Sequence, residues 1–151
     1  MPEGRVHIRR GRRTDFTAVM ALLASSGVAV PAPERATLHR FRQLVADLGG
    51  DFYLASVDGA VVGLVHVTYA RQLATPPSAS LDQLVVAPAF RRCGIGSKLL
   101  AFVQRRAQQR GCVALASVVA HAAPVGARAF LAGVGLTPDG ERFVKPLRPQ
   151  D

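Results

Sequence analysis

Tryptophan is absent from this chain of 151 residues, and cysteine occurs only twice. Cys93 and Cys112 form neither a CxxC pair nor a cluster with histidine. This argues against a disulfide scaffold or a structural zinc site, and we expect no metal. No apolar run approaches the ~20 residues that span a bilayer, and no apolar signal core follows the N-terminus. We therefore predict a cytoplasmic protein that binds no membrane.

Acidic residues are also few. Asp and Glu number 10 against 19 Lys and Arg, which gives a formal net charge of +9 and favours an anionic ligand. The basic stretches at 9–13 and 40–42 would suit nucleic acid, but no aromatic interleaving and no nucleic-acid-binding motif accompanies them. We therefore favour solvated helix faces and attraction for a polyanionic cofactor, with a basic nucleic-acid-binding domain as a rival hypothesis.

The length predicts one domain over residues 1–151, and 49% hydrophobic residues are enough for a folded core. The hydrophobic periodicity predicts the element order β-α-α-β-β-β-α-β-α-β. Expected strands cover 6–10, 52–57, 60–69, 81–86 and 113–119, with one or two more within 136–147. Expected helices cover 34–48, 94–110 and 125–134, after a first helix that is capped by Thr14, has Asp15 in its first turn and stops at Gly27. A loop is expected at 72–80.

Two local signals fix the connections. Asp58-Gly59 favours a tight hairpin, and Gly111 favours a helix C-terminal cap. The strand–helix–strand unit over 81–119 requires parallel strands, whereas the hairpin requires antiparallel ones. We therefore predict a mixed, mostly antiparallel sheet flanked by helices, an α/β (α+β) fold.

The most informative segment is 84–100, LVVAPAFRRCGIGSKLL. A helix start exposes unpaired N–H groups and partial positive charge, and Gly94 and Gly96 would let a ligand approach the backbone. This favours a phosphate or pyrophosphate site. The GxG alone matches neither the GxxxxGK[ST] nor the GxGxxG fingerprint, and an ordinary strand-to-helix turn would also explain it. The basic side chains that would add attraction are Arg91, Arg92 and Lys98.

The full pattern, RxxGxG after an LVVxP strand and before an amphipathic helix, resembles motif A of the Gcn5-related N-acetyltransferase (GNAT) superfamily. Further segments resemble that superfamily in the right order: 9–15 its first strand and helix start, 51–66 its central hairpin, 127–136 its motif B, and 142–147 the closing strand of several members. The resemblance covers essentially the whole chain. It implies a sheet splayed at a parallel strand pair, where acetyl-CoA inserts.

The resemblance also implies how acetyl-CoA is held. Backbone amides of the loop, with Ser97, would bind the pyrophosphate, and the backbones of Leu84 and Val86 would bond the pantetheine arm. The expected cofactor-binding residues are Leu84, Val85, Val86, Arg91, Arg92, Cys93, Gly94, Ile95, Gly96, Ser97 and Lys98. Cys93 is not expected to act as a nucleophile, because no histidine or acid is near it in the sequence.

Asp82 and His121 are the candidate catalytic residues. Asp82 lies where relatives often carry a base or water-holding carboxylate, although a structural carboxylate paired with a loop or an arginine would also fit. His121 lies near a position where relatives often contact the cofactor, and its imidazole titrates in a useful range; an exposed loop histidine is the alternative. His66 is expected to be a half-buried strand residue. Leu131 falls where most members carry a tyrosine that is thought to protonate the leaving thiolate.

The resemblance therefore predicts an acyltransferase that moves an acetyl group from acetyl-CoA to a primary amine by direct attack. The runs at 96–101 and 142–147 resemble aminoalkylphosphonate N-acetyltransferases, an anionic acceptor class that the excess of arginine would suit. A protein N-terminal or lysine acetyltransferase is one alternative. A CoA-binding module without catalysis, suggested by Leu131, is another. A homodimer is compatible with the resemblance, since relatives are often dimers.

Overall fold

The structure, a computed structural model, describes residues 4–121, 123 and 126–149. The chain divides into two compact units, Met1–Ser117 and Val118–Asp151, and each is described by itself. The expectation of one domain over the whole chain stays a prediction.

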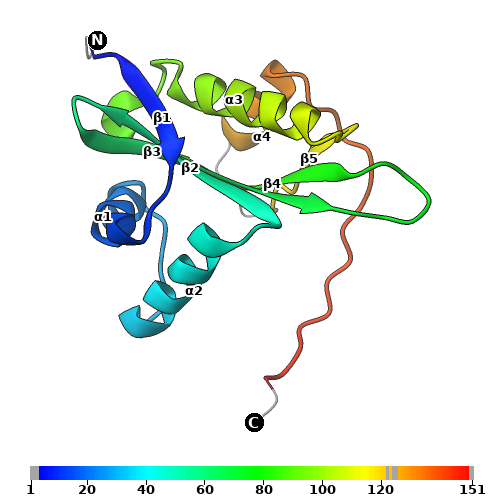
Figure 1. The fold of residues 1–151 in the computed structure, drawn as a ribbon, viewed down its shortest axis with the longest axis horizontal. Coiled ribbons are helices and arrows are strands. Elements are labelled where there is room, and N and C mark those ends of the chain that lie inside the picture. Colours follow the sequence, from blue (N-terminus) through cyan, green and yellow to red (C-terminus); the bar gives the residue numbers. More distant parts are fainter. Residues whose placement is uncertain (1–3, 122, 124–125, 150–151) are drawn as a thin grey trace. The chain divides into compact units, whose positions relative to one another are not determined.

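The first unit is built on a five-stranded sheet in the order β1-β2-β3-β4-β5 (Figure 1). The strands are β1 (Val6–Arg10), β2 (Gly50–Val57), β3 (Ala60–Ala70), β4 (Ser78–Val86) and β5 (Leu115–Ser117). Neighbouring strands run antiparallel except β4 and β5, which are parallel and joined by the crossover helix α3 (Ile95–Gln109). The predicted mixed, mostly antiparallel sheet with a parallel pair is confirmed.

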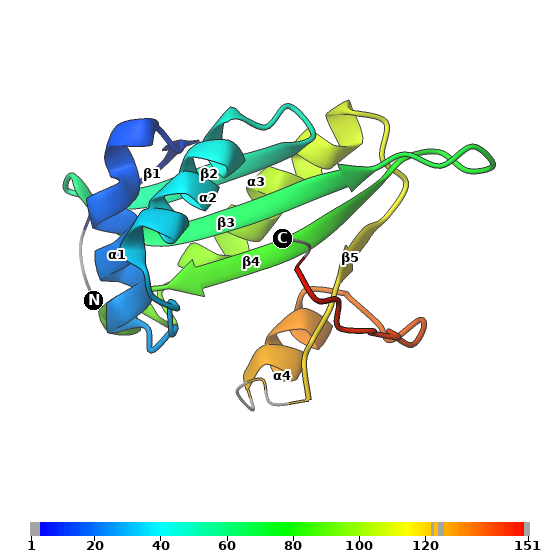
Figure 2. The ribbon, with the colours of Figure 1, turned by 90° about the horizontal axis from the view of Figure 1, so that it is seen from below.

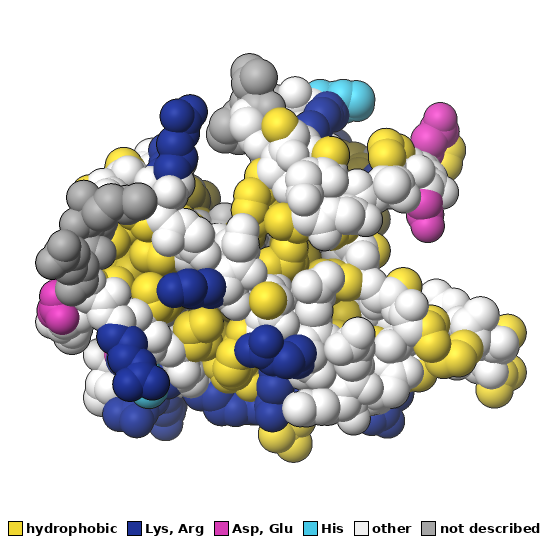
Figure 3. Space-filling model, turned by 90° about the horizontal axis from the view of Figure 1, so that it is seen from above, with side chains coloured by type: hydrophobic (Ala, Val, Ile, Leu, Met, Phe, Trp, Pro, Cys, Tyr) yellow, Lys and Arg dark blue, Asp and Glu magenta, His cyan; other side chains and the backbone are white. Residues whose placement is uncertain are grey.

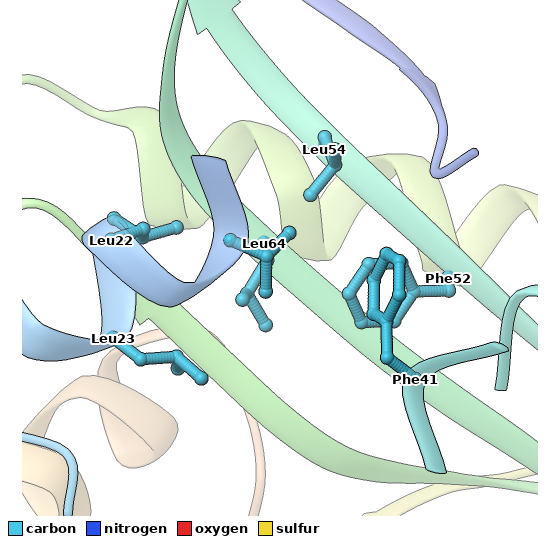
Figure 4. Packing of buried hydrophobic residues seen from close by; sticks show 7 residues of the cluster. Leu22, Leu23, Phe41, Phe52, Leu54 and Leu64 are labelled. Atoms are coloured by element: carbon cyan, nitrogen blue, oxygen red, sulfur yellow. The ribbon is translucent and has the colours of Figure 1, made fainter. Parts of the chain in front are cut away.

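Helices cover both faces of this sheet. α1 (Phe16–Ser25) and α2 (Glu34–Ala46) lie on one face and α3 on the other (Figure 2). Under α1 and α2, a core cluster joins the two helices to β2 and β3; Phe41 of α2 stacks edge-on against Phe52 of β2, with ring centroids 5.8 Å apart (Figure 4). On the other face, Phe102 of α3 packs edge-on against Tyr53 at 4.7 Å. The alternation of Phe52 and Tyr53 between faces fixes the sheet register, because a slip of one residue would exchange them.

A buried carboxylate ties the strands to the end of α3. The Asp51 side chain is fully buried, and its Oδ2 accepts a hydrogen bond from the Tyr69 hydroxyl at 2.5 Å. Its Oδ1 lies 2.9 Å from Arg10 Nη2 and 3.7 Å from Arg110 Nη2. Arg110 also covers the Tyr69 ring, 4.1 Å from its centroid. A buried carboxylate requires such partners, since leaving it unpaired would cost several kcal/mol (about 3–5).

Two helix C-termini lie close to the positions that the sequence predicts. α1 ends at Ser25, with Gly27 in the left-handed region at φ +73° two residues later, and α3 ends at Gln109, with Gly111 in the left-handed region at φ +80°. The Cys112 N–H bonds back to the Ala107 carbonyl at 2.9 Å, which completes a Schellman cap. The predicted C-terminal cap at Gly111 is thus confirmed.

The start of the first helix differs from the expectation that Thr14 caps it. Thr14 lies inside a 3₁₀ turn, Arg13–Asp15, and the Asp15 carboxylate accepts the Arg12 N–H at 2.6 Å instead. The Arg9 guanidinium holds both Asp15 oxygens at 2.8 Å, and this hydrogen bonding is the main reason that the pKa of Asp15 is lowered. A carboxylate already fixed by an arginine is the better cap acceptor here.

Other element boundaries also need correction. The second helix ends at Ala46, because the backbone at Asp47 is extended, and β2 begins at Gly50. Residues 78–80 of the expected loop 72–80 belong to β4. The expected strand 113–119 forms only over Leu115–Ser117.

The second unit contains α4 (Gly126–Gly133), close to the expected helix 125–134, whose residue 125 lies outside the described residues. The strands expected within 136–147 are wrong, since these residues form no strand. Pro138 and Pro146 lack the N–H that a strand ladder needs. No helix among the described residues has the length and apolarity required to cross a membrane.

Candidate cofactor and acceptor site

The turn from β4 into α3 leaves a row of backbone N–H groups free. Arg92 has φ +61° and Gly94 φ +77°, so the chain passes twice through the left-handed region before α3 starts. In the part of the chain that the structure describes, the N–H groups of residues 92–97 donate to no oxygen, and the first helical bond is from Lys98 N–H to the Gly94 carbonyl at 3.0 Å. Such a turn ahead of a helix forms an anion-binding nest.

Gly94 keeps the approach to this nest open. No atom lies within 4 Å of the position that a Cβ would take there. Since an L side chain also strains at φ +77°, glycine serves both the turn and the access to it. The expected motif A geometry, a strand, a glycine-bearing loop and a helix start, is therefore present in the structure.

Positive charge surrounds the free N–H groups. The exposed side chains near the loop include Arg91, Arg92 and Lys98. Lys and Arg side chains are spread over the α3 side of the first unit, where few acidic ones appear (Figure 3). Cys93 is half-buried and its Sγ lies 3.6 Å from the Arg91 carbonyl oxygen, an ordinary turn contact. The site attracts anions by its helix start and by these side chains together.

Gly63 sets how closely the helix start can approach the sheet. A Cβ on Gly63 would lie 3.1 Å from Leu99 Cδ1 and 3.3 Å from Ile95 Cγ2, both in the first turns of α3. These contacts are tight, so a side chain at this position would push the helix away from β3. The glycine in the predicted central hairpin thus positions the free N–H groups beside the end of β4.

β4 loses its neighbour on one side just where it approaches this turn. Its parallel ladder with β5 ends at the pair Leu81 and Ser117. On the other side, β3 pairs Val67 with Leu81 and His66 with Gln83, which leaves Asp82 as the extra residue of a β-bulge. A bulge bends and twists a strand, and this accounts for the short β5 ladder. Within the described chain, residues 82–86 of β4 therefore form an open edge.

The register identifies which groups face the open edge. Ala87 N–H bonds to the Val62 carbonyl at 2.8 Å, so the pair 62/87 is hydrogen-bonded and the pairs 63/86 and 65/84 are not. The N–H and C=O groups of Leu84 and Val86 consequently point away from β3. The Val86 carbonyl accepts a bond of 3.4 Å from Arg91 Nε. Leu84 and Val86 are the two residues expected to bond the pantetheine arm, while Val85 pairs with β3.

Asp82 lies in a polar cluster on the sheet face that α1 and α2 cover. Its Oδ2 accepts the Thr68 hydroxyl at 2.6 Å, and its Oδ1 accepts the Ser80 hydroxyl at 2.7 Å. His66 Nδ1 lies 3.9 Å from Oδ2, and its ring packs 6.1 Å from that of Phe52. Burial lowers the pKa of His66, while Asp82 and Asp47 oppose that shift. Asp82 is thus an oriented carboxylate at the bulge.

A surface hollow of about 490 Å³ opens beside the end of α2. Arg40 and Asp47 contribute opposite charges to its wall, along with Gln43, Leu44 and Ala46. The negative charge of Asp47 acts on His66 and partly offsets the lowering of its pKa by burial, which relates this end of α2 to the cluster around Asp82.

The structure thus brings Asp82 and the expected cofactor-binding residues onto one continuous strand–loop–helix segment. His121 lies in the second unit, as an exposed turn residue, and Leu131 lies in α4 of that unit. Sequence reasoning found His66 only as a half-buried strand residue, which is correct, and missed its proximity to Asp82. His66 and Asp82 both lie in expected strands, 60–69 and 81–86, but which residues of the two strands face each other depends on the bulge.

In the described ranges, no group of three or more His, Cys, Asp or Glu side chains could hold a metal ion. Comparison with protein families gives one decisive result: the profile of the Acetyltransferase (GNAT) family matches residues 16–135. The chain belongs to the GNAT family of acetyltransferases. Acetyl-CoA is the acetyl donor of this family, which agrees with the expected co-substrate.

No curated protein matches the chain. Solved structures do. A transcriptional regulator from Bacillus halodurans C-125 is 22% identical, with 95% of this chain and 100% of that chain covered and a TM-score of 0.82. The aminoglycoside 6'-N-acetyltransferase AAC(6')-Ih from Acinetobacter baumannii is 23% identical, with 97% and 100% covered and a TM-score of 0.80. AAC(6')-Iy in complex with the bisubstrate analogue CoA-S-monomethyl-acetylneamine is 20% identical, with 95% and 99% covered and a TM-score of 0.80. These likenesses show the GNAT fold.

Proposed function

We propose that this GNAT protein transfers the acetyl group of acetyl-CoA to the primary amine of a small molecule. The observation that carries the proposal is the combination of free N–H groups at residues 92–97, the open edge of β4 and an oriented carboxylate, Asp82, on the same segment. The solved relative AAC(6')-Iy holds a bisubstrate analogue that joins CoA to an aminoglycoside, which supports an amine acceptor.

In this proposal the cofactor extends from the start of α3 back along β4, opposite to the direction of the polypeptide chain. Its diphosphate binds the N–H groups before α3, where positive charge and the helix dipole stabilise it. The pantetheine arm then extends along the outward groups of Val86 and Leu84 like an added strand. From Val86 to Asp82 the strand spans about 13 Å. The thioester accordingly lies in the plane of the sheet near the bulge, and the acceptor reaches it from the α1–α2 face.

The chemistry needs a free amine and a stabilised oxyanion. A protonated amine gives a proton to the Asp82 carboxylate, and its lone pair then attacks the thioester carbonyl carbon. The outward N–H of Leu84, two residues beyond Asp82, is the donor we assign to the carbonyl oxygen. The carbon–sulfur bond breaks and sulfur leaves with the electron pair. Because a thiol ordinarily has a pKa near 8.5, the thiolate can leave without a tyrosine and take its proton from water.

We further assign the hollow at the end of α2 to the acceptor. Arg40 supplies a positive charge for an anionic group, and Asp47 a negative charge near the amine. This charge pattern favours an acceptor that carries both an amine and an anion, such as an aminoalkylphosphonate, over a purely cationic polyamine.

The experiment is a free-thiol release assay with acetyl-CoA and a panel of amines. The panel contains aminoalkylphosphonates, aminoglycosides, polyamines, and peptides with free N-termini or lysines. We expect amine-dependent thiol release, greatest with the aminoalkylphosphonates. Turnover of peptides alone would instead establish the protein acetyltransferase alternative.

Binding of acetyl-CoA without turnover of any amine would favour a non-catalytic CoA-binding module. Failure to bind acetyl-CoA would refute the proposal as a whole. DNA affinity with a steep salt dependence, in the absence of acetyl-CoA binding, would favour the nucleic-acid alternative. Calorimetry with acetyl-CoA and with duplex DNA distinguishes these outcomes.

A further inference from the structure

Among residues 4–117 of the first unit, His66 is the one imidazole that lies near the proposed catalytic carboxylate. It lies on β3, opposite Gln83, and the bulge displaces Asp82 so that its Oδ2 comes within 3.9 Å of His66 Nδ1. That separation is too long for a hydrogen bond and short enough for an ion pair when the imidazole is protonated.

The two side chains differ in access. The Asp82 side chain is 37% exposed, whereas that of His66 is only 13% exposed and stacks against Phe52. A substrate amine can therefore meet Asp82 but not His66. The hydroxyls of Thr68 and Ser80 fix the carboxylate from the other directions. His66 is placed to act through Asp82 rather than on the substrate.

The surroundings of His66 keep it neutral near neutral pH. Burial lowers its pKa below the ordinary value of 6.5, and this is the largest effect. The charged groups that act in the opposite direction are Asp82 from β4 and Asp47 from the end of α2. A neutral imidazole beside a carboxylate can accept a proton, and the carboxylate then stabilises the imidazolium.

From this geometry we infer that His66 is a positioning residue that takes up the proton Asp82 receives from the acceptor amine. The inference rests on the proposed function. The ammonium N–H bond breaks and the proton passes to Asp82. A small rotation of the two side chains during the reaction closes the 3.9 Å gap to hydrogen-bonding distance, and the proton then passes to His66 Nδ1, which restores the carboxylate. The nitrogen–carbon bond forms and the carbon–sulfur bond breaks as already described. The nitrogen gives its second proton to water as the tetrahedral intermediate collapses, and water returns one proton to the CoA thiolate, so that these two transfers cancel. The proton on His66 is then released to solvent, and it is the one proton that the overall reaction sets free.

The first test needs no activity. The imidazole signals of the protein are titrated by NMR in the wild type, in Asp82→Asn and in the control Asp58→Asn. Asp58 lies exposed in the β2–β3 turn, in a left-handed conformation that asparagine tolerates. We expect a pKa below 6.5 for His66 and a further fall in Asp82→Asn alone, because a stabilising negative charge is lost. An unchanged His66 pKa in Asp82→Asn would overturn the inference.

The second test uses the pH dependence of kcat/KM. His66→Asn keeps a polar amide near the Nδ1 position but cannot titrate, and His7→Asn, an exposed residue of the edge strand β1, is the matched control. For His66→Asn we expect a loss of about 10- to 100-fold at pH 7, less than a direct acid–base group supplies. The His66-dependent fall in rate below pH 6.5 should also disappear, with acetyl-CoA affinity unchanged.

These outcomes separate the inference from the proposed function. A wild-type protein that acetylates no amine contradicts the proposed function, and the NMR titration then still decides whether His66 and Asp82 interact. A wild-type enzyme whose pH profile is the same in His66→Asn contradicts the inference alone. Should His66→Asn unfold, the Asp82→Asn titration, made in a protein that retains His66, supplies the decision.

Discussion

Gly94→Asp is the substitution that tests the anion site most selectively. Gly94 has φ +77° and open space around the Cβ position, so the variant meets no steric clash and only the cost of left-handed backbone, about 1–2 kcal/mol. Its carboxylate would enter the space that we assign to the diphosphate. The fold should therefore survive while acetyl-CoA binding fails.

The size of the effect follows from Coulomb's law. Two unit charges about 5 Å apart repel by about 0.8 kcal/mol in water and by about 3 kcal/mol at an effective dielectric constant of about 20. The diphosphate carries about two such charges. Since about 1.4 kcal/mol corresponds to a factor of ten, the affinity for acetyl-CoA should fall at least about tenfold, measured by titration calorimetry.

Gly111→Asp is the matched control. Gly111 has φ +80°, equally open space and a place at the opposite end of α3, so its backbone cost is the same. We expect Gly111→Asp to bind acetyl-CoA like the wild type. Equal affinities for Gly94→Asp and the wild type, or equal losses in both variants, would refute the assignment of the diphosphate to this turn.

Three further predictions follow from the packing and the charges. Gly63→Val should push α3 from β3, lower the free energy of unfolding in urea by about 1–3 kcal/mol and weaken acetyl-CoA binding, whereas unchanged stability would contradict the close packing. Burial, together with the hydrogen bond to Asp51, raises the pKa of Tyr69. Asp51→Asn should lower the free energy of unfolding by about 1–3 kcal/mol and lower the Tyr69 pKa part of the way, which an ultraviolet titration measures. The lowered pKa of Asp15 stabilises the native state above the ordinary value of 3.8, and this contribution is lost as pH falls through the native pKa. Asp15→Asn should therefore destabilise the protein more at pH 7 than at pH 2; an equal deficit at both would contradict the role of Arg9.

The sequence predicted best where local signals decide the structure. α3 was expected at 94–110 and lies at Ile95–Gln109, because its amphipathic pattern, its preceding glycine and the cap at Gly111 act within the segment itself. The strand–loop–helix site was expected for the same reason. Its decisive features, a glycine at a positive φ and a helix start, are encoded by adjacent residues.

The sequence predicted least where the local structure depends on contacts with segments that are distant in the chain. The end of β5 depends on the bulge at Asp82, and the neighbourhood of His66 depends on the same bulge, which no local pattern announces. Thr14 is a good cap by residue type, yet it lies inside a 3₁₀ turn, where the Asp15 carboxylate, held by Arg9 from β1, accepts the Arg12 N–H. The segment 136–147 contains Pro138 and Pro146, which lack the N–H that a strand ladder needs, and no strand forms there.

The most direct test of the central claim is a crystal structure of the protein with CoA bound. We expect diphosphate oxygens within hydrogen-bonding distance of the N–H groups of residues 92–97, and the pantetheine arm along Leu84 and Val86. A diphosphate bound elsewhere on the protein, with this turn in contact with no part of the cofactor, would contradict it.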